Sequence, residues 1–352
     1  MINLQYLKSI FVFTFLLAAL TPLGNAEEFY VDPLKGGDDR SGSKEQPFAT
    51  VTKAVSVANA LTGTGPITIK LAPGVYVLSD KISIQPARIS ADDTRFTIEA
   101  QVMPDDKEWA PGKMPVIQSI SANNSVSEFP HSTGFLVSAN NVTFQGLKFL
   151  GNPNPAVVYY YPITKENESL RGLEVSQCYF ISEKNSVPIQ GGIWAHGPDT
   201  DINHCIFYNC RNAILLFKSV AGFSITHTVI YGANESAVWM GPIESGFVFK
   251  NNVVTKCRYF WVRPENSKPA YAFSDCLITD NDFHTGFYTR KGLIGTAPES
   301  DGNFTETNIV RAGKVMLVEK SDEKLPKDYL NLTPESDGYS LGTGIFKAPR
   351  TK

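Results

Sequence analysis

A six-residue phrase recurs six times between residues 144 and 283 of this 352-residue chain. Each copy has branched or aromatic residues at its ends and a leucine, cysteine, threonine or asparagine in fourth place. The copies are FQGLKF, VSQCYF, INHCIF, ITHTVI, FKNNVV and ITDNDF, and their starts are 31, 27, 23, 24 and 29 residues apart. A period of this length, built from short strands and irregular turns, indicates a solenoid of stacked β-coils.

The fourth place of the phrase predicts an internal column of side chains. Stacked coils lie about 4.8 Å apart, so equivalent residues of successive coils come into contact. The predicted column contains Leu147, Cys178, Cys205, Thr228, Asn252 and Asn281. Its amides can hydrogen-bond along the stack and would fix the register of the other residues.

A further strand follows the phrase in each coil, as GIWAHG (192–197), AILLFK (213–218), AVWMGP (237–242), YFWVRP (259–264) and GFYTRK (286–291). Because side chains alternate across a strand, one set faces the core and the other faces outward. The expected outward set is Trp194, His196, Leu215, Phe217, Trp239, Trp261, Arg263, Tyr288 and Arg290. A one-residue slip would turn the tryptophans into the core, but it would also bury Arg263 and Arg290 at a cost. We therefore expect the outward arrangement.

The N-terminal part differs from the coils. Apolar residues at helical spacing between Thr50 and Leu61 predict a helix, and alternation over residues 67–71 predicts a strand. One helix followed only by strands indicates an all-β body with an N-terminal capping helix. No Ser/Gly-rich or Pro-rich linker divides the chain, so we expect a single domain. It spans residues 27–352, with a cap region at 27–75, the clearest coils at 135–291, and a C-terminal coil and tail at 292–352.

In these features the chain resembles the right-handed parallel β-helix proteins of the pectate-lyase-like superfamily. The resemblance is carried by FYVDPLKGGDDRSGSKEQPFATVTKAV near the start, IKLAPGVY, the coil repeats, and DYLNLTPESDGYSLGTG near the end. It implies a right-handed parallel β-helix (solenoid). That superfamily contains polysaccharide lyases, glycoside hydrolases, uronan epimerases and proteins with no known catalysis, so the resemblance implies no single activity.

The first 26 residues have the pattern of a secretory signal peptide. Lys8 precedes an apolar run from Ile10 to Leu20, and small or polar residues lead to Ala26, the expected cleavage position. The run is too short to cross a bilayer, so we expect a secreted or periplasmic protein with no membrane span. Loss of Lys8 takes the formal charge from −3 to −4, which argues against nucleic-acid binding. The expected partner is a polysaccharide, and the expected state is a monomer.

The five cysteines are odd in number for an oxidising compartment, so at least one is unpaired. We expect them to be buried as small apolar residues. The sequence pattern identifies no definite cofactor. Calcium is the one ion considered, because Glu244 and Glu265 follow neighbouring strands and could supply oxygen ligands. The dense aspartate cluster of pectate lyase calcium sites is not visible in the sequence.

The outward aromatic residues suggest a sugar-binding strip. Aromatic faces cover the apolar faces of pyranose rings, and a guanidinium group can hold a carboxylate in a bidentate fork. The predicted substrate-binding residues are Trp194, Trp239, Trp261, Tyr288 and Arg290.

The predicted activity is a polysaccharide lyase that acts by β-elimination on an acidic, uronate-containing polysaccharide. A base removes the proton beside the uronate carboxylate while cations stabilise the developing charge. In lyases of the families that this chain resembles, lysine or arginine commonly does the proton work. The candidate catalytic residues are therefore Lys218, Arg263 and His196.

Two alternatives remain. A glycoside hydrolase on the same fold would need two carboxyl groups about 5 to 9.5 Å apart, and Asp199, Asp201, Glu244 and Glu265 follow the outward strands. A non-catalytic β-helix would bind or present glycan at the cell surface. The two classes differ in whether a base, a cation and a binding strip converge on one groove.

Overall fold

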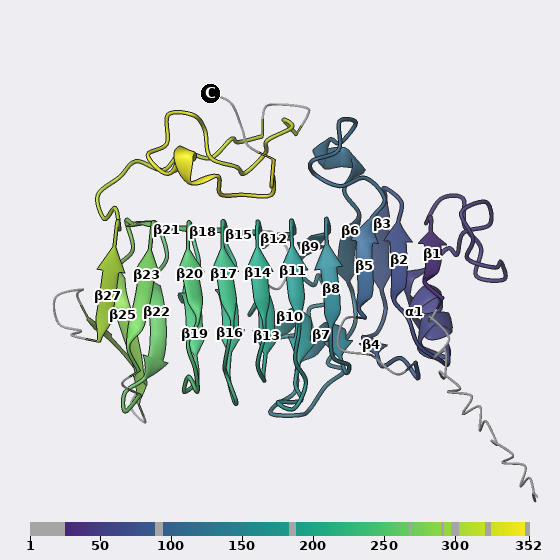
Figure 1. The fold of residues 1–352 in the computed structure, drawn as a ribbon, viewed down its shortest axis with the longest axis horizontal. Helices are drawn as coiled ribbons and strands as arrows, with labels where there is room; N and C mark the ends of the chain where they lie inside the picture. Colours follow the sequence, from purple (N-terminus) through teal and green to yellow (C-terminus); the bar gives the residue numbers. More distant parts are fainter. Residues whose placement is uncertain are drawn as a thin grey trace, which may run out of the picture.

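Three parallel β-sheets wind around a common core in the computed structural model (Figure 1). The structure describes residues 25–88, 94–182, 188–267, 269–289, 292–296, 303–320 and 325–348. Along the chain each coil supplies one strand to each sheet in turn, for example β8, β9 and β10. The expected parallel β-helix fold is confirmed. The predicted signal peptide covers residues 1–26, and residues 1–24 of it lie outside the described ranges.

Sheet A contains β1 (Glu27–Val31), β2 (Ile67–Leu71), β5 (Phe96–Ala100), β8 (Val142–Gln145), β11 (Glu174–Ser176), β14 (Asp201–Asn203), β17 (Ser224–Thr226), β20 (Val248–Lys250), β23 (Tyr271–Ser274) and β27 (Phe304–Thr307). Sheet B contains β3 (Val75–Leu78), β6 (Val116–Ser119), β9 (Lys148–Leu150), β12 (Tyr179–Ile181), β15 (Ile206–Tyr208), β18 (Val229–Tyr231), β21 (Val253–Thr255) and β24 (Leu277–Thr279). Sheet C contains β4 (Ile82–Ile84), β7 (Ser132–Val137), β10 (Tyr160–Lys165), β13 (Ile193–Ala195), β16 (Asn212–Leu216), β19 (Ser236–Met240), β22 (Tyr259–Pro264), β25 (Phe283–Thr289) and β26 (Gly292–Thr296), which pairs antiparallel to β25.

The turn from sheet A to sheet B repeats one backbone conformation. Its first residue has a positive φ of 50° to 53° at Gln177, His204, His227, Asn251 and Asp275, a left-handed conformation that amides and histidine tolerate better than most residues. The next residue points inward and builds the predicted column. Thr228 N–H donates to Asn252 Oδ1 over 2.9 Å, and Cys205 N–H donates to Thr228 Oγ1.

The predicted column is correct up to Asn252 and wrong at its last member. Val253 pairs with Leu277, so Asn252 stacks on Cys276 rather than on Asn281. Asn281 belongs to a second column, where its Oδ1 accepts from the Cys257 N–H over 2.9 Å. The last copy of the phrase was therefore placed five residues too late along the chain, on a similar pattern in the following turn.

Stacked side chains fill the space between the sheets. Phe149, Phe180 and Phe207 lie on one another with ring centroids 4.8 and 4.6 Å apart and nearly parallel planes. All five cysteines are buried and free, as expected. Burial of apolar surface at each coil contributes the stability that these short strands lack by themselves.

Helix α1 (Val51–Asn59) begins at Thr50, whose side chain accepts a hydrogen bond from the Lys53 N–H. Its buried residues Val51, Ala54, Val55 and Ala58 form an apolar face, and the helix contacts β1, β2 and β4. It lies at the end of the solenoid that β1 occupies (Figure 1). Its expected role as the cap that closes this end stays a prediction. No helix among the described residues is long and apolar enough to span a membrane.

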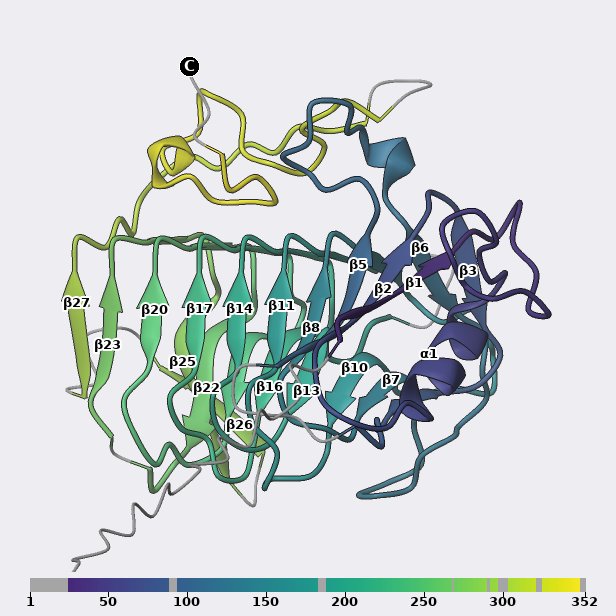
Figure 2. The same ribbon diagram turned by 45° about the vertical axis from the view of Figure 1, so that its right-hand side comes forward.

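The C-terminal segment lies over the outer face of sheet B, beside the segment that leads into β6 (Figure 2). Its apolar side chains cover a row of outward residues on that sheet. The contacting groups are Leu330, Leu332, Ile345 and Phe346 from the segment and Tyr179, Ile206, Val229, Val253 and Leu277 from the sheet. Sheet B is therefore largely closed to solvent along these coils, whereas the outer face of sheet C is not covered in this way.

A pair of stacked histidines contacts this segment. His204 and His227 stack with centroids 4.7 Å apart, and His204 Nδ1 donates to the Gly344 carbonyl. Burial first, then the neighbouring His227, lowers the pKa of His204 to about 4. Lys347 acts in the same direction as His227, and Asp105 opposes them.

Because the folded state keeps His204 neutral, its unfolded form gains a proton first as the pH falls below about 6.5. We expect stability to be unaffected by this group above pH 6.5 and to fall progressively from pH 6.5 to 4, by roughly 3 kcal/mol at most. Thermal melts of the wild type and of His204→Gln across this range measure it. The variant should lose less stability than the wild type, and an equal loss in both would contradict the assignment.

Candidate functional site

An open groove of about 980 Å³ runs over the outer face of sheet C. Part of its floor comes from one outward position in three successive strands, which holds Trp194, Leu215 and Trp239. Leu215 and Trp239 line the groove together with Phe217 and Tyr288.

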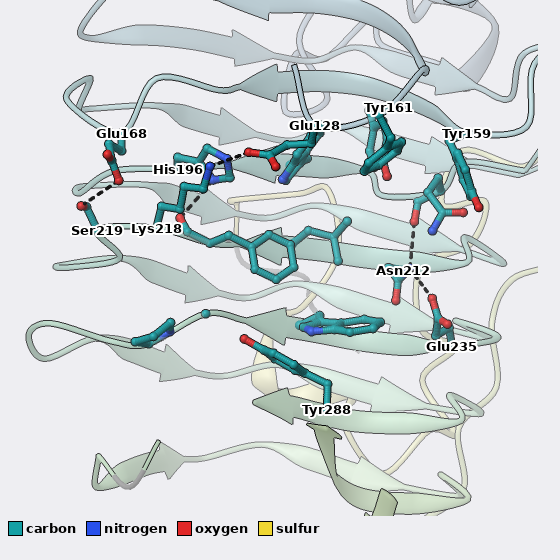
Figure 3. Close-up of a pocket in the computed structure, with 18 of the residues that line it drawn as sticks. Glu128, Tyr159, Tyr161, Glu168, His196, Asn212, Lys218, Ser219, Glu235 and Tyr288 are labelled. Atoms are coloured by element: carbon teal, nitrogen blue, oxygen red, sulfur yellow. Dashed lines mark hydrogen bonds and ion pairs between the residues drawn. The ribbon is translucent and has the colours of Figure 1, made fainter. Parts of the chain in front are cut away.

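Polar side chains gather at two ends of this floor (Figure 3). One end carries Glu128, Glu168, His196, Lys218 and Ser219. The other carries Tyr159, Tyr161, Arg211, Asn212 and Glu235. The groove thus joins an apolar centre to hydrogen-bonding groups on both sides.

The expected outward placement of Trp261 is wrong. Its side chain is 0% exposed and pairs in register with the inward residue Val238, while Val262 takes the outward place beside Trp239. The coil repeat here is 23 residues, and the two tryptophans are only 22 residues apart. That difference of one residue reverses the face on which the ring lies.

The expected outward placement of Arg263 is also wrong. Its side chain is 3% exposed, yet its charge is not isolated. The guanidinium lies over the rings of Phe287 and Tyr271, 4.5 and 5.4 Å from their centroids, and it donates to the Ser267 carbonyl. These contacts offset the burial cost that had argued against the slipped register.

Trp239 and Tyr288 are the predicted aromatic residues that the groove leaves partly exposed. Their ring centroids lie 5.8 Å apart with planes at 41°. Burial raises the pKa of the Tyr288 hydroxyl, so this group stays protonated and can donate a hydrogen bond. The predicted residue Arg290 lies outside the described residues.

Trp194 lines the groove but is only 5% exposed. Phe129 stacks on it with centroids 5.9 Å apart and planes at 16°, and Tyr161 packs beside it at 4.8 Å. Phe129 belongs to the segment between β6 and β7, which sequence patterns did not place near sheet C. As the structure stands, Trp194 supports the wall of the groove and offers little open surface to a ligand.

The segment that carries Phe129 is fixed by contacts between the buried His131 and the carboxylate of Glu166. His131 is fully buried, with Nδ1 donating to the Phe129 carbonyl over 2.8 Å and Nε2 lying 3.4 Å from Glu166. Burial raises the pKa of Glu166, but hydrogen bonds from His131, Ser127 and Ser125 outweigh it and lower the pKa to about 2. This carboxylate remains charged and holds the segment in place.

His196 lies at one end of the groove and is 3% exposed. Its Nδ1 donates to the Phe217 carbonyl over 3.1 Å, which leaves the lone pair of the neutral ring on Nε2. Burial first, then the charge of Lys218, lowers the pKa of His196 below its usual value of 6.5. The imidazole is therefore neutral near pH 7 and can accept a proton.

Lys218 projects into the same end and forms an ion pair with Glu128. Their side chains are 52% and 45% exposed. The hydrogen bond and charge of Glu128 raise the pKa of Lys218, and Lys218 in turn lowers the pKa of Glu128. Both groups therefore stay charged at neutral pH.

The hydrolase candidates do not converge on the groove. Of the carboxylates predicted from the sequence, only Glu244 lines it, whereas Asp199 and Asp201 line a separate hollow beside sheet A. The other carboxylates that line the groove belong to Glu128, Glu168 and Glu235. The strand pattern could not find Glu128 and Glu168, because both lie on irregular segments between strands.

The structure adds no candidate calcium site. Among the described residues, no three His, Cys, Asp or Glu side chains gather in a way that could hold a metal ion.

Comparisons with known proteins add little on activity. The family described as "Protein of unknown function (DUF1565)" matches residues 34–171, which is less than half of the chain. No curated protein matches the chain.

Several solved structures are distantly similar. GH136 lacto-N-biosidase from Eubacterium ramulus is 11% identical with a TM-score of 0.45, over 81% of this chain and 68% of that one. Pectin methylesterase PemA from Erwinia chrysanthemi is 14% identical with a TM-score of 0.40, over 87% and 92%. A rhamnogalacturonan lyase is 12% identical with a TM-score of 0.39, over 91% and 99%. At such scores these likenesses carry no argument about the groove, and the fold rests on the chain's own strand pairings.

Proposed function

We propose that the groove on sheet C binds a glycan chain. The observation that carries this proposal is the partly exposed aromatic floor of Phe217, Trp239 and Tyr288 in an open groove with polar groups at both ends. Aromatic rings cover the apolar faces of sugar rings, while carboxylates, amides and hydroxyls hydrogen-bond to sugar hydroxyl groups.

The bound glycan is cleaved, in this proposal, at the end of the groove that holds His196. A neutral imidazole with Nε2 unprotonated suits a general base. Lys218 and Glu128 lie close enough to affect its pKa in opposite directions. The remaining tyrosines and amides at the far end would orient the chain.

Two reactions are open to this cluster. In β-elimination on a uronate, His196 would take the proton and Lys218 would have to leave Glu128 to face the substrate carboxylate. In hydrolysis, the protonated carboxyl group of Glu168 would donate its proton to the leaving glycosidic oxygen, while His196 would act as the base that takes a proton from the attacking water. The excess of carboxylates over cations among the groove residues favours hydrolysis over the lyase reaction expected from the sequence.

The sequence of the first 26 residues supports export before this activity. A secreted or periplasmic protein would meet polymeric glycans there. Detection of the mature chain beginning at Glu27 outside the cytoplasm would test this part of the proposal.

Binding to an array of neutral, acidic and amine-bearing oligosaccharides tests the proposed function. Trp239→Ala should weaken binding of the best ligand about tenfold, because the largest stacking surface is lost. Tyr231→Ala is a matched control, since Tyr231 is a partly buried aromatic residue on sheet B, away from the groove. Reducing ends report hydrolysis, and absorbance of unsaturated uronate reports elimination. Binding without either product would favour the non-catalytic alternative, and no binding at all would overturn the proposal.

A further inference from the structure

The charged side chains of the sheet-C groove are unevenly balanced. Four carboxylates line the groove, against two permanent cations. They are Glu128, Glu168, Glu235 and Glu244 on one side and Arg211 and Lys218 on the other. His196 adds no charge near pH 7, because its pKa is lowered mainly by burial.

Both cations are already engaged by carboxylates of the same groove. Lys218 is paired with Glu128. Arg211 contacts Glu235 through Nε at 3.2 Å and through Nη2 at 3.3 Å, in a two-pronged arrangement. Asn212 Nδ2 also donates to Glu235 over 2.8 Å and keeps that carboxylate oriented. A substrate carboxylate would have to displace one of these partners before it could reach a cation.

The other two carboxylates are exposed and face the groove without such a partner. Glu168 accepts a hydrogen bond from Ser219 Oγ over 3.3 Å, and neither Glu168 nor Glu244 forms an ion pair with a described residue. A negatively charged ligand would approach two carboxylates of its own sign that have no ion-pair partner among the described residues, although the charge of Lys218 also acts on Glu168. An ammonium group on a sugar ring would find two acceptors of opposite sign.

We infer that the groove selects glycans without carboxylates, and that amine-bearing sugars bind at least as well as uncharged ones. This inference rests on the proposed function, because it concerns the ligand of the same groove. It reverses the uronate preference expected from the sequence. The aromatic floor supplies affinity for any sugar ring, and the carboxylates decide which substituents are tolerated.

Oligosaccharides of equal length and linkage that differ in one substituent on each sugar ring, a hydroxyl, amino or carboxyl group, provide the test. One set has β-1,4 linkages: cello-oligosaccharides, fully deacetylated chitosan oligosaccharides, and β-1,4-glucuronan oligosaccharides. A second set has α-1,4 linkages: oligogalacturonates and the same chains after reduction of their carboxyl groups. Affinities are measured by calorimetry at pH 7 and about 20 mM salt, where charges are weakly screened.

We expect each carboxylated chain to bind at least tenfold more weakly than its uncharged counterpart, and the chitosan chain to bind as tightly as cello-oligosaccharide or more tightly. The double variant Glu168→Gln and Glu244→Gln should reduce both differences, and about 0.5 M salt should reduce them in the wild type. Tighter binding of a uronate chain than of its uncharged counterpart would overturn the inference and leave the proposed function standing. Failure of every chain, in both sets and on the wider array, would overturn the proposed function and the inference with it.

Discussion

Replacing Trp261 by alanine should lower the free energy of unfolding by about 3 to 5 kcal/mol and leave glycan affinity nearly unchanged. The ring is fully buried and packs against aromatic neighbours, with centroids 5.0 Å from Phe273, 5.6 Å from Phe247 and 5.7 Å from Phe249. Its removal leaves a cavity that the stacked coils above and below cannot readily close. Chemical denaturation measures the loss of stability, and calorimetry measures the affinity.

Trp239→Ala is the matched control, since the same residue type is changed one coil away on the opposite face of sheet C. This ring is partly exposed in the groove, so we expect a smaller loss of stability and a clear loss of glycan affinity. Equal stability losses in the two variants, or a loss of affinity confined to Trp261→Ala, would contradict the register described for β19 and β22.

Replacing His196 by glutamine should lower turnover of a cleaved glycan by two to four orders of magnitude, the usual contribution of a general base. Glutamine can keep the hydrogen bond to the Phe217 carbonyl, but it cannot accept the substrate proton. The folded fraction should stay close to that of the wild type, as thermal melts at pH 7.5 would show. Unchanged turnover in a folded variant would remove His196 from the mechanism.

The pH profile adds an independent reading of the same residue. Because the pKa of His196 lies below 6.5, the acid limb of kcat/KM should fall below that pH. Burial sets most of this shift, and the charge of Lys218 adds to it. Lys218→Met should therefore move the acid limb to higher pH, whatever its effect on the maximal rate. An acid limb that does not move would show that another group controls it.

The solenoid fold could be predicted from the sequence because the same residue types recur at equivalent positions of each coil. Turn residues with a positive φ and the inward column from Leu147 to Asn252 recur at each coil, so their pattern can be read without neighbours in space. The cysteines followed the same logic, as small apolar residues of that interior.

The face of each side chain was harder to predict, because one residue of coil length decides it. The spacing between Trp239 and Trp261 is one residue shorter than the 23-residue repeat of these coils. Nothing in the sequence of β22 itself indicates this difference. The partners that allow Arg263 to be buried are a ring from the next coil and a carbonyl from a turn. Such partners depend on tertiary packing. The cost of burying a charge, considered alone, therefore predicted the wrong face of the strand for Arg263.

Several polar groups of the groove could not be predicted, for a related reason. Glu128 and Phe129 come from the segment before β7, and Glu168 comes from the segment after β10, where strand periodicity gives no direction. Only the stacking of coils brings them beside Lys218 and His196. His196 itself was predicted, because it stands two residues after the outward Trp194, directly after the end of β13.

The measurement that tests the central claim most directly is a crystal structure of the mature chain with the tightest-binding oligosaccharide from the array. We expect sugar rings along the outer face of sheet C, with an apolar ring face against Trp239 and the scissile linkage beside His196 Nε2. A glycan bound with full occupancy on sheet A or sheet B, with the sheet-C groove empty, would contradict the account.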